Sequence, residues 1–135
     1  MKILSKSLAV IALATGMVLA AGVAPASAAD YVSVPDRYVY NPDATYQRTL
    51  HDYCTMSPDE FSAPGTNANF RGPCARHDLC IMDRAVARST CDSRFKSNLL
   101  QQCEHYYGSW DPRRAACKST ALTYYAVVSV KTKLS

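Results

Sequence analysis

Residues 74–80 read CARHDLC, and a Cys91-Asp92 pair follows further along the chain. The two segments combine a histidine with carboxylates, the side chains that move protons in many hydrolytic reactions. A neutral imidazole can take a proton from a water molecule that attacks an ester carbonyl, while a carboxylate on its other ring nitrogen fixes the tautomer. We therefore predict that His77 is a general base and that Asp92 orients it.

A second carboxylate, Asp78, follows the histidine directly. Adjacent residues on a helix point roughly 100° apart, so Asp78 serves a different partner from His77. Calcium takes about six to eight hard oxygen ligands from carboxylates, backbone carbonyls and waters. We expect Asp78 and Asp52 to bind Ca2+ together with carbonyls beside Asp52 in its loop.

Hydrophobic spacing predicts three helices in the second half of the chain. Their expected bounds are 74 to about 89, 92 or 93 to 108, and 112 onward. A straight first helix would hold His77 too far from Asp92, because a helix rises about 1.5 Å per residue. We therefore expect a break after about Met82, with a loop up to Cys91, so that two antiparallel helices carry His77 and Asp92.

The remaining segments are predicted to be less regular. Residues 30–42 form an irregular arm, Asp43 caps a short helix that runs to about Asp52, and residues 56–73 form a loop rich in proline and glycine. The β-branched stretch 124–130 is kept helical, because no partner strand is predicted for it. The expected fold class is all-α.

The first 28 residues have the pattern of an export signal. Basic Lys2 and Lys6 precede an uncharged stretch, 8–24, and the small-x-small sequence Ala26-Ser27-Ala28. A retained membrane anchor is the alternative, because the apolar stretch nearly reaches the roughly 20 residues that span a bilayer. We predict that residues 1–28 are removed, and that residues 29–135 form one secreted domain.

All six cysteines lie after residue 28: Cys54, Cys74, Cys80, Cys91, Cys103 and Cys117. An even number in a small exported domain favours three disulfides, and the sequence does not choose among their pairings. A zinc site built from Cys74, His77, Cys80 and Cys91 is the alternative. It would leave an odd set of three cysteines in an oxidising compartment.

The charge balance limits the partners. The formal net charge of the whole chain is +4, and without Lys2 and Lys6 the remaining 13 basic and 11 acidic residues give +2. This is too little to indicate nucleic acid. The balance either favours anionic lipid surfaces or merely keeps the domain soluble, and the aromatic residues, Trp110 among them, serve either a lipid interface or the core.

Other candidates are weaker. His51 and His105 have no acid pattern of a catalytic site around them, and we expect both at the surface. Arg76 is either a solvated helix charge or a ligand for a lipid phosphate. Tyr124 or Tyr125 is expected either to donate a hydrogen bond to Asp92 or simply to pack, because buried tyrosine hydroxyls usually need a partner.

Three segments of the chain resemble the secreted phospholipase A2 family, most closely its small bacterial and fungal members of the actinobacterial type. The segments are His51-Asp52-Tyr53-Cys54-Thr55, Pro73-Cys74-Ala75-Arg76-His77-Asp78, and the residues 116–125, ACKSTALTYY. With Asp92 to Cys103 added, the resemblance covers most of residues 52–126.

The resemblance implies a role for each matching residue. His77 would activate water, with Asp92 as its orienting partner. Asp52, Asp78 and the backbone carbonyl of Tyr53 would bind Ca2+. The substrate would be the sn-2 ester of glycerophospholipids in membrane surfaces or micelles, and we expect the protein to act as a monomer.

The resemblance also implies the disulfides Cys54–Cys74, Cys80–Cys91 and Cys103–Cys117. The bridge Cys80–Cys91 departs from the bacterial pattern towards the animal one, and a shorter link between His77 and Asp92 accompanies it. The glycine-rich calcium loop of the animal enzymes is missing, and Asp52 offers a carboxylate there instead. A catalytically silent secreted binding protein or toxin-like module on the same scaffold is the alternative function.

Overall fold

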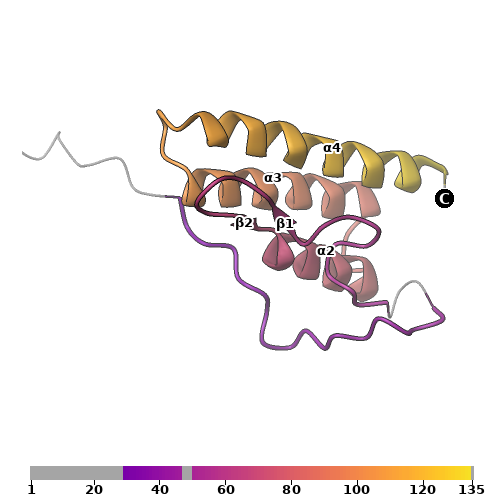
Figure 1. Cartoon of the computed structure of the whole chain (residues 1–135). Coiled ribbons are helices and arrows are strands. Elements are labelled where there is room, and N and C mark those ends of the chain that lie inside the picture. Colours follow the sequence, from indigo (N-terminus) through magenta and orange to yellow (C-terminus); the bar gives the residue numbers. More distant parts are fainter. Residues whose placement is uncertain (1–28, 47–49, 135) are drawn as a thin grey trace, which may run out of the picture.

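The computed structural model describes residues 29–46 and 50–134. Within these residues the chain is mainly helical, with α2 at Arg71–Asp83, α3 at Arg88–Tyr106 and α4 at Pro112–Leu134. Helix α3 contacts both of the others, and α4 lies along it over most of its length (Figure 1). The expected small helical domain is confirmed, with one addition, a pair of two-residue strands.

The link between α2 and α3 positions the site. Helix α2 ends where Arg84 adopts a left-handed conformation with φ of 54°, and α3 begins at Arg88. The predicted break near Met82 is therefore confirmed, but α3 starts before Cys91 and not after it. Because the link is short, the two helices turn back on each other, as expected for an antiparallel pair.

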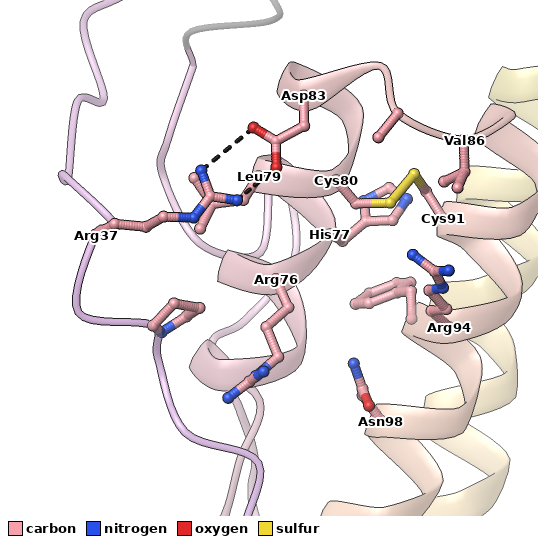
Figure 2. A pocket seen from close by; sticks show the side chains of 13 residues that line it. Arg37, Arg76, His77, Leu79, Cys80, Asp83, Val86, Cys91, Arg94 and Asn98 are labelled. Atoms are coloured by element: carbon pink, nitrogen blue, oxygen red, sulfur yellow. Dashed lines mark hydrogen bonds and ion pairs between the residues drawn. A yellow bond between two sulfur atoms is a disulfide. The ribbon is translucent and has the colours of Figure 1, made fainter.

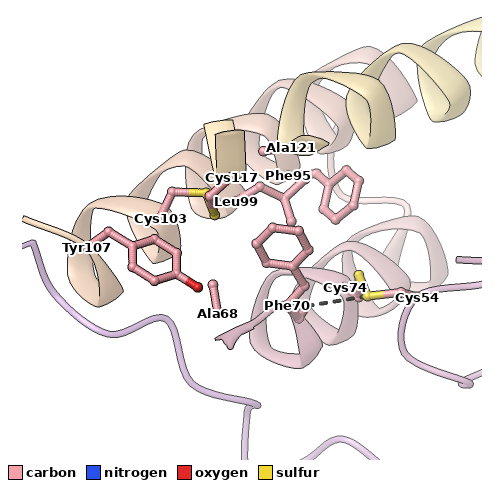
Figure 3. Packing of buried hydrophobic residues seen from close by; sticks show 10 residues of the cluster. All are labelled: Cys54, Ala68, Phe70, Cys74, Phe95, Leu99, Cys103, Tyr107, Cys117 and Ala121. Carbon is pink, nitrogen blue, oxygen red and sulfur yellow. Dashed lines mark hydrogen bonds between the residues drawn. A yellow bond between two sulfur atoms is a disulfide. The ribbon is translucent and has the colours of Figure 1, made fainter. Parts of the chain in front are cut away.

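A buried cluster between the helices holds them together (Figure 3). Phe95 and Leu99 of α3 face Phe70 at the start of α2 and Ala121 of α4, and each of these four is at most 4% exposed. Phe70 meets Tyr124 edge to face. The cluster fixes the register of α3 between its neighbours and thereby the place of Asp92, one turn before Phe95.

Three disulfides link the elements: Cys54–Cys74, Cys80–Cys91 and Cys103–Cys117. These are the pairings that the family resemblance implies. The predicted alternative of a zinc site is wrong, because the sulfurs of Cys74, Cys80 and Cys91 are bonded to other sulfurs and offer no thiolate to a metal.

The arm before α2 is irregular, as predicted, and is held against the helices. The backbone N–H of Val32 donates to the buried Gln102 side chain at 2.7 Å. Gly72 lies so close to the arm that an added Cβ would be 1.8 Å from the Val32 carbonyl oxygen. Only glycine permits this approach between arm and helix.

Two predictions for the segment before α2 are wrong. The described residues of 43–52 form no helix; instead Asn41 and His51 pair as an antiparallel bridge, which holds the backbone extended. Within the predicted loop 56–73, β1 (Glu60–Phe61) pairs with β2 (Ala68–Asn69), and α2 begins at Arg71, earlier than expected.

The predicted export signal, residues 1–28, lies outside the described residues. Among the helices that the structure describes, none is long and apolar enough to cross a membrane.

Candidate active site

His77 and Asp92 meet at the junction of α2 and α3. His77 Nε2 lies 2.7 Å from Asp92 Oδ1, and the two side chains are 15% and 3% exposed. An ionised carboxylate only accepts hydrogen bonds, so Nε2–H donates to it and the lone pair remains on Nδ1. The pair therefore has the geometry of an oriented base with Nδ1 as its reactive nitrogen.

The Cys80–Cys91 bridge lies beside His77 (Figure 2). It joins α2 to α3 one turn beyond His77 and one residue before Asp92. Because a cross-link between two helices limits their sliding, the bridge restrains the distance between the imidazole and the carboxylate. The bridge, which departs from the bacterial pattern, is therefore compatible with the hydrogen bond between His77 and Asp92.

The second oxygen of Asp92 accepts a hydrogen bond from Thr132 Oγ1, at 2.6 Å, in the last turns of α4. The expectation that Tyr124 or Tyr125 donates to Asp92 is wrong. The Tyr124 hydroxyl donates to the Pro58 carbonyl at 2.7 Å, and the Tyr125 ring lies under the Lys96 ammonium group. Sequence reasoning missed Thr132, because an isolated threonine late in a helix carries no signal of its own.

The environment of His77 favours the neutral form of its imidazole. Burial lowers the pKa of His77 below its ordinary value, and the positive charges of Arg88 and Lys131 lower the pKa further. The hydrogen bond and the charge of Asp92 act in the opposite direction but do not outweigh burial. A lowered pKa favours the proton-accepting form near neutral pH.

Asp78 points to a different partner from His77, as predicted. Its Oδ2 accepts a hydrogen bond from the Tyr38 hydroxyl at 2.7 Å. Burial raises the pKa of Asp78 to about 7; the Tyr38 hydrogen bond lowers it and the negative charge of Asp52 raises it. A buried carboxylate that is destabilised by a second carboxylate is a site where a cation would be favourable.

Tyr38 also contacts the loop that carries the other predicted ligands. Its oxygen accepts a hydrogen bond from the Tyr53 N–H at 2.9 Å. Tyr53 has a φ of 60°, a conformation that non-glycine residues adopt rarely and mostly at constrained sites. Next to it, Thr55 Oγ1 donates to Asp52 Oδ1 at 2.6 Å, and the Cys54–Cys74 bridge ties the loop to α2.

A cavity of about 480 Å³ brings these residues together. Its polar part contains Asp52, Tyr53, His77 and Asp78. Its apolar walls are Ile81, Phe95, Val127, Val128, Leu50 and Met56. The structure therefore places all the predicted catalytic and metal-binding residues around one cavity, except Asp92, which does not line it but contacts His77.

Within the described part of the chain no three His, Cys, Asp or Glu side chains cluster as a metal site. A cation in the cavity would thus depend on two carboxylates, Asp52 and Asp78, and on backbone carbonyls and water. Such a mixed oxygen set suits Ca2+ better than zinc, which prefers nitrogen and sulfur.

His77 also lines a second cavity, of about 370 Å³ (Figure 2). Arg37 and Asp83 form an ion pair at its edge. Arg76 also lines it, but its Nε donates to the Ser33 carbonyl at 2.8 Å, so this guanidinium holds the arm. No carboxylate besides Asp83 lines this cavity, and it lacks the pair Asp52 and Asp78.

The two other histidines, His51 and His105, differ in their exposure to solvent. His105 is exposed, as predicted. The same prediction for His51 is wrong, because this residue is only 7% exposed and its ring stacks on Tyr38 with the centroids 4.9 Å apart. His51 Nδ1–H donates to the Val39 carbonyl at 3.0 Å, so this histidine supports the residue that contacts Asp78.

Comparison with known proteins identifies the family of the chain. A family model described as prokaryotic phospholipase A2 matches residues 30–132, and the chain belongs to that family. No curated protein and no solved structure matches the chain significantly.

Proposed function

We propose that this protein is an exported phospholipase A2 that hydrolyses the sn-2 ester of glycerophospholipids with the help of Ca2+. The observation that carries the proposal is the His77–Asp92 pair, which leaves His77 Nδ1 as the base beside the cavity that Asp52 and Asp78 line. Family membership supports phospholipase A2 activity in general. The details of the mechanism are inferred from the residues.

In the proposed reaction His77 Nδ1 removes a proton from a water molecule, and the water oxygen bonds to the ester carbonyl carbon. Asp92 holds the ring and stabilises the imidazolium that forms. As the carbon–oxygen bond to the glycerol breaks, the imidazolium returns the proton to the departing alkoxide. The products are a free fatty acid and a lysophospholipid, and His77 is neutral again.

The residues around Asp78 fit a calcium ion. Asp52 and Asp78 supply carboxylates to one cavity, and burial raises the pKa of Asp78, which supports a cation beside it. Asp52, Asp78 and the carbonyl of Tyr53 would hold the ion. When bound, Ca2+ would supply Lewis-acid stabilisation of the charge that develops on the carbonyl oxygen.

The cavity also fits a lipid in chemical character. A volume of about 480 Å³ lies within the usual range of ligand sites, and its apolar walls suit an acyl chain next to the polar residues that suit an ester. We propose phospholipid in membranes or micelles as the substrate, a monomer as the working form, and no nucleic-acid partner.

Turnover on mixed phospholipid vesicles tests this function. The mature protein, residues 29–135, should release fatty acid with Ca2+ and not with a chelator. His77→Gln should abolish turnover while a calorimetric calcium titration remains unchanged, because the amide can fill the site but cannot act as the base. Equal turnover by His77→Gln would exclude the general-base assignment.

A further inference from the structure

The outer face of α4 near its end has an unusual composition. Helix α4 contains no acidic residue, and two lysines, Lys131 and Lys133, stand in its last turn. Three apolar side chains recur there at helical spacing and face solvent: Val127, Val130 and Leu134 are 61%, 55% and 84% exposed. Lysines at a helix end also offset the helix dipole, but that does not account for the exposed apolar side chains near them.

This face adjoins the mouth of the cavity. Val127 and Lys131 belong to the cavity wall, and Met56, fully exposed, lies on the wall formed by the loop. The exposed apolar groups therefore continue into the space that is proposed to hold the acyl chain. A lipid that leaves a bilayer here would pass from one apolar surface to another.

We propose that the end of α4 docks on an anionic phospholipid surface, with Val130 and Leu134 entering the interface and Lys133 contacting lipid phosphates. This inference rests on the proposed function, because it assigns the aggregated substrate as the partner. Charge complementarity favours anionic lipid over a neutral surface. Trp110 is 98% exposed, but it lies before Pro112, where α4 begins. Along the helix axis Pro112 is roughly 30 Å from Thr132 at 1.5 Å per residue, so Trp110 is not part of this face.

Vesicle sedimentation in chelator tests the docking face separately from catalysis. Val130→Glu combined with Leu134→Glu should weaken binding to phosphatidylglycerol vesicles by about tenfold or more, because two apolar groups are lost from the interface. Lys133→Glu alone should weaken it too. Trp110→Glu, the matched control, should bind as the unaltered protein does.

Turnover of monomeric short-chain phosphatidylcholine should stay unchanged in all these variants, which also shows that they fold. If the proposed catalysis is wrong, the unaltered protein and all the variants show no turnover of the monomeric lipid, while they still differ in vesicle binding. Equal binding by all the variants, or loss confined to Trp110→Glu, would overturn the docking assignment, as would equal affinity for neutral vesicles.

A separate observation concerns the inner face of the same helix. Asp92 is 2% exposed, and its two oxygens accept from His77 on one side and from Thr132 Oγ1 on the other. Two hydrogen bonds in different directions fix the rotation of a carboxylate. We infer that Thr132 is a positioning residue, which acts on the reaction by holding Asp92 in the orientation that aligns His77.

Thr132→Val, which removes the hydroxyl at nearly constant shape, should lower kcat by about 10- to 100-fold, the usual effect of removing an outer hydrogen bond at a catalytic site. KM should not change, since Thr132 is proposed to act through Asp92. Thr132→Ser should restore most of the activity. The matched control, Thr123→Val, removes an exposed hydroxyl that bonds only within α4, to the Ser119 carbonyl, and should leave kcat unchanged.

The imidazole N–H resonance of His77 gives a second readout. In Thr132→Val the Nε2–H signal should move, because its acceptor is no longer held from both sides. An unchanged kcat in Thr132→Val, or a Thr132→Ser variant as slow as the valine variant, would overturn the positioning role.

Discussion

Calcium binding is expected to displace a proton from Asp78. In the ion-free protein burial raises the pKa of Asp78 to about 7, whereas a bound cation requires the carboxylate. For a single site with that pKa, about 90% of the molecules are protonated at pH 6 and about 10% at pH 8. The apparent calcium affinity should therefore be about tenfold weaker at pH 6 than at pH 8.

Isothermal titration calorimetry in buffers of different ionisation enthalpy measures this coupling. Roughly 0.9 proton should be released per calcium at pH 6 and roughly 0.1 at pH 8. The His77→Gln background removes the neighbouring imidazole, so that the released proton belongs to Asp78. Asp78→Asn should bind calcium weakly and release no proton.

Tyr38→Phe tests the effect of the Tyr38 hydrogen bond on the pKa of Asp78. The Tyr38 hydroxyl donates to Asp78 and lowers its pKa, so its removal should move the midpoint of proton release to higher pH. A midpoint of proton release that moves to lower pH would show that the Tyr38 hydroxyl does not lower the pKa of Asp78. A proton count near zero at pH 6 in the His77→Gln background would show that calcium displaces no proton from Asp78.

Three further outcomes are expected. The acid limb of kcat should have its midpoint below 6.5, because burial lowers the pKa of His77 and the neutral imidazole is the active form; a midpoint well above 6.5 would contradict it. Replacing Cys80 and Cys91 by serine should cost about 2–3 kcal/mol in urea unfolding and reduce kcat, and undiminished kcat would show that the bridge does not restrain the His77–Asp92 pair. Without calcium, the raised pKa of Asp78 makes stability fall as pH rises from about 4 to about 7. Calcium binds the ionised carboxylate, so it should raise Tm more at pH 8 than at pH 5. An equal rise at both pH values would argue against Asp78 as a ligand.

The sequence was sufficient for the parts of the site that are local. His77, Asp78 and Asp92 lie close together in the chain, and a simple length argument predicted that the helix between them breaks. The break occurs at Arg84, in a left-handed conformation. The helix that begins at Pro112 was also predictable, because proline suits the first turn.

The parts that depend on distant contacts were not predictable. Thr132 reaches Asp92 only through the register in which α4 packs on α3, and that register is set by the core around Leu99 and Ala121. Tyr38 lies on an arm without hydrophobic period, which gives no sign that its hydroxyl contacts Asp78. The bridge from Asn41 to His51 replaced the expected helix, because backbone pairing and stacking outweighed a single capping residue.

The proposed function depends on which ester bond is cut and on whether a divalent cation is needed. Mass spectrometry of the products from a phospholipid with two different acyl chains decides both points. We expect the sn-2 fatty acid and the matching 1-acyl lysophospholipid to appear with calcium and to be absent with chelator. Release of the sn-1 chain, or equal release of fatty acid in chelator, would exclude a calcium-dependent phospholipase A2.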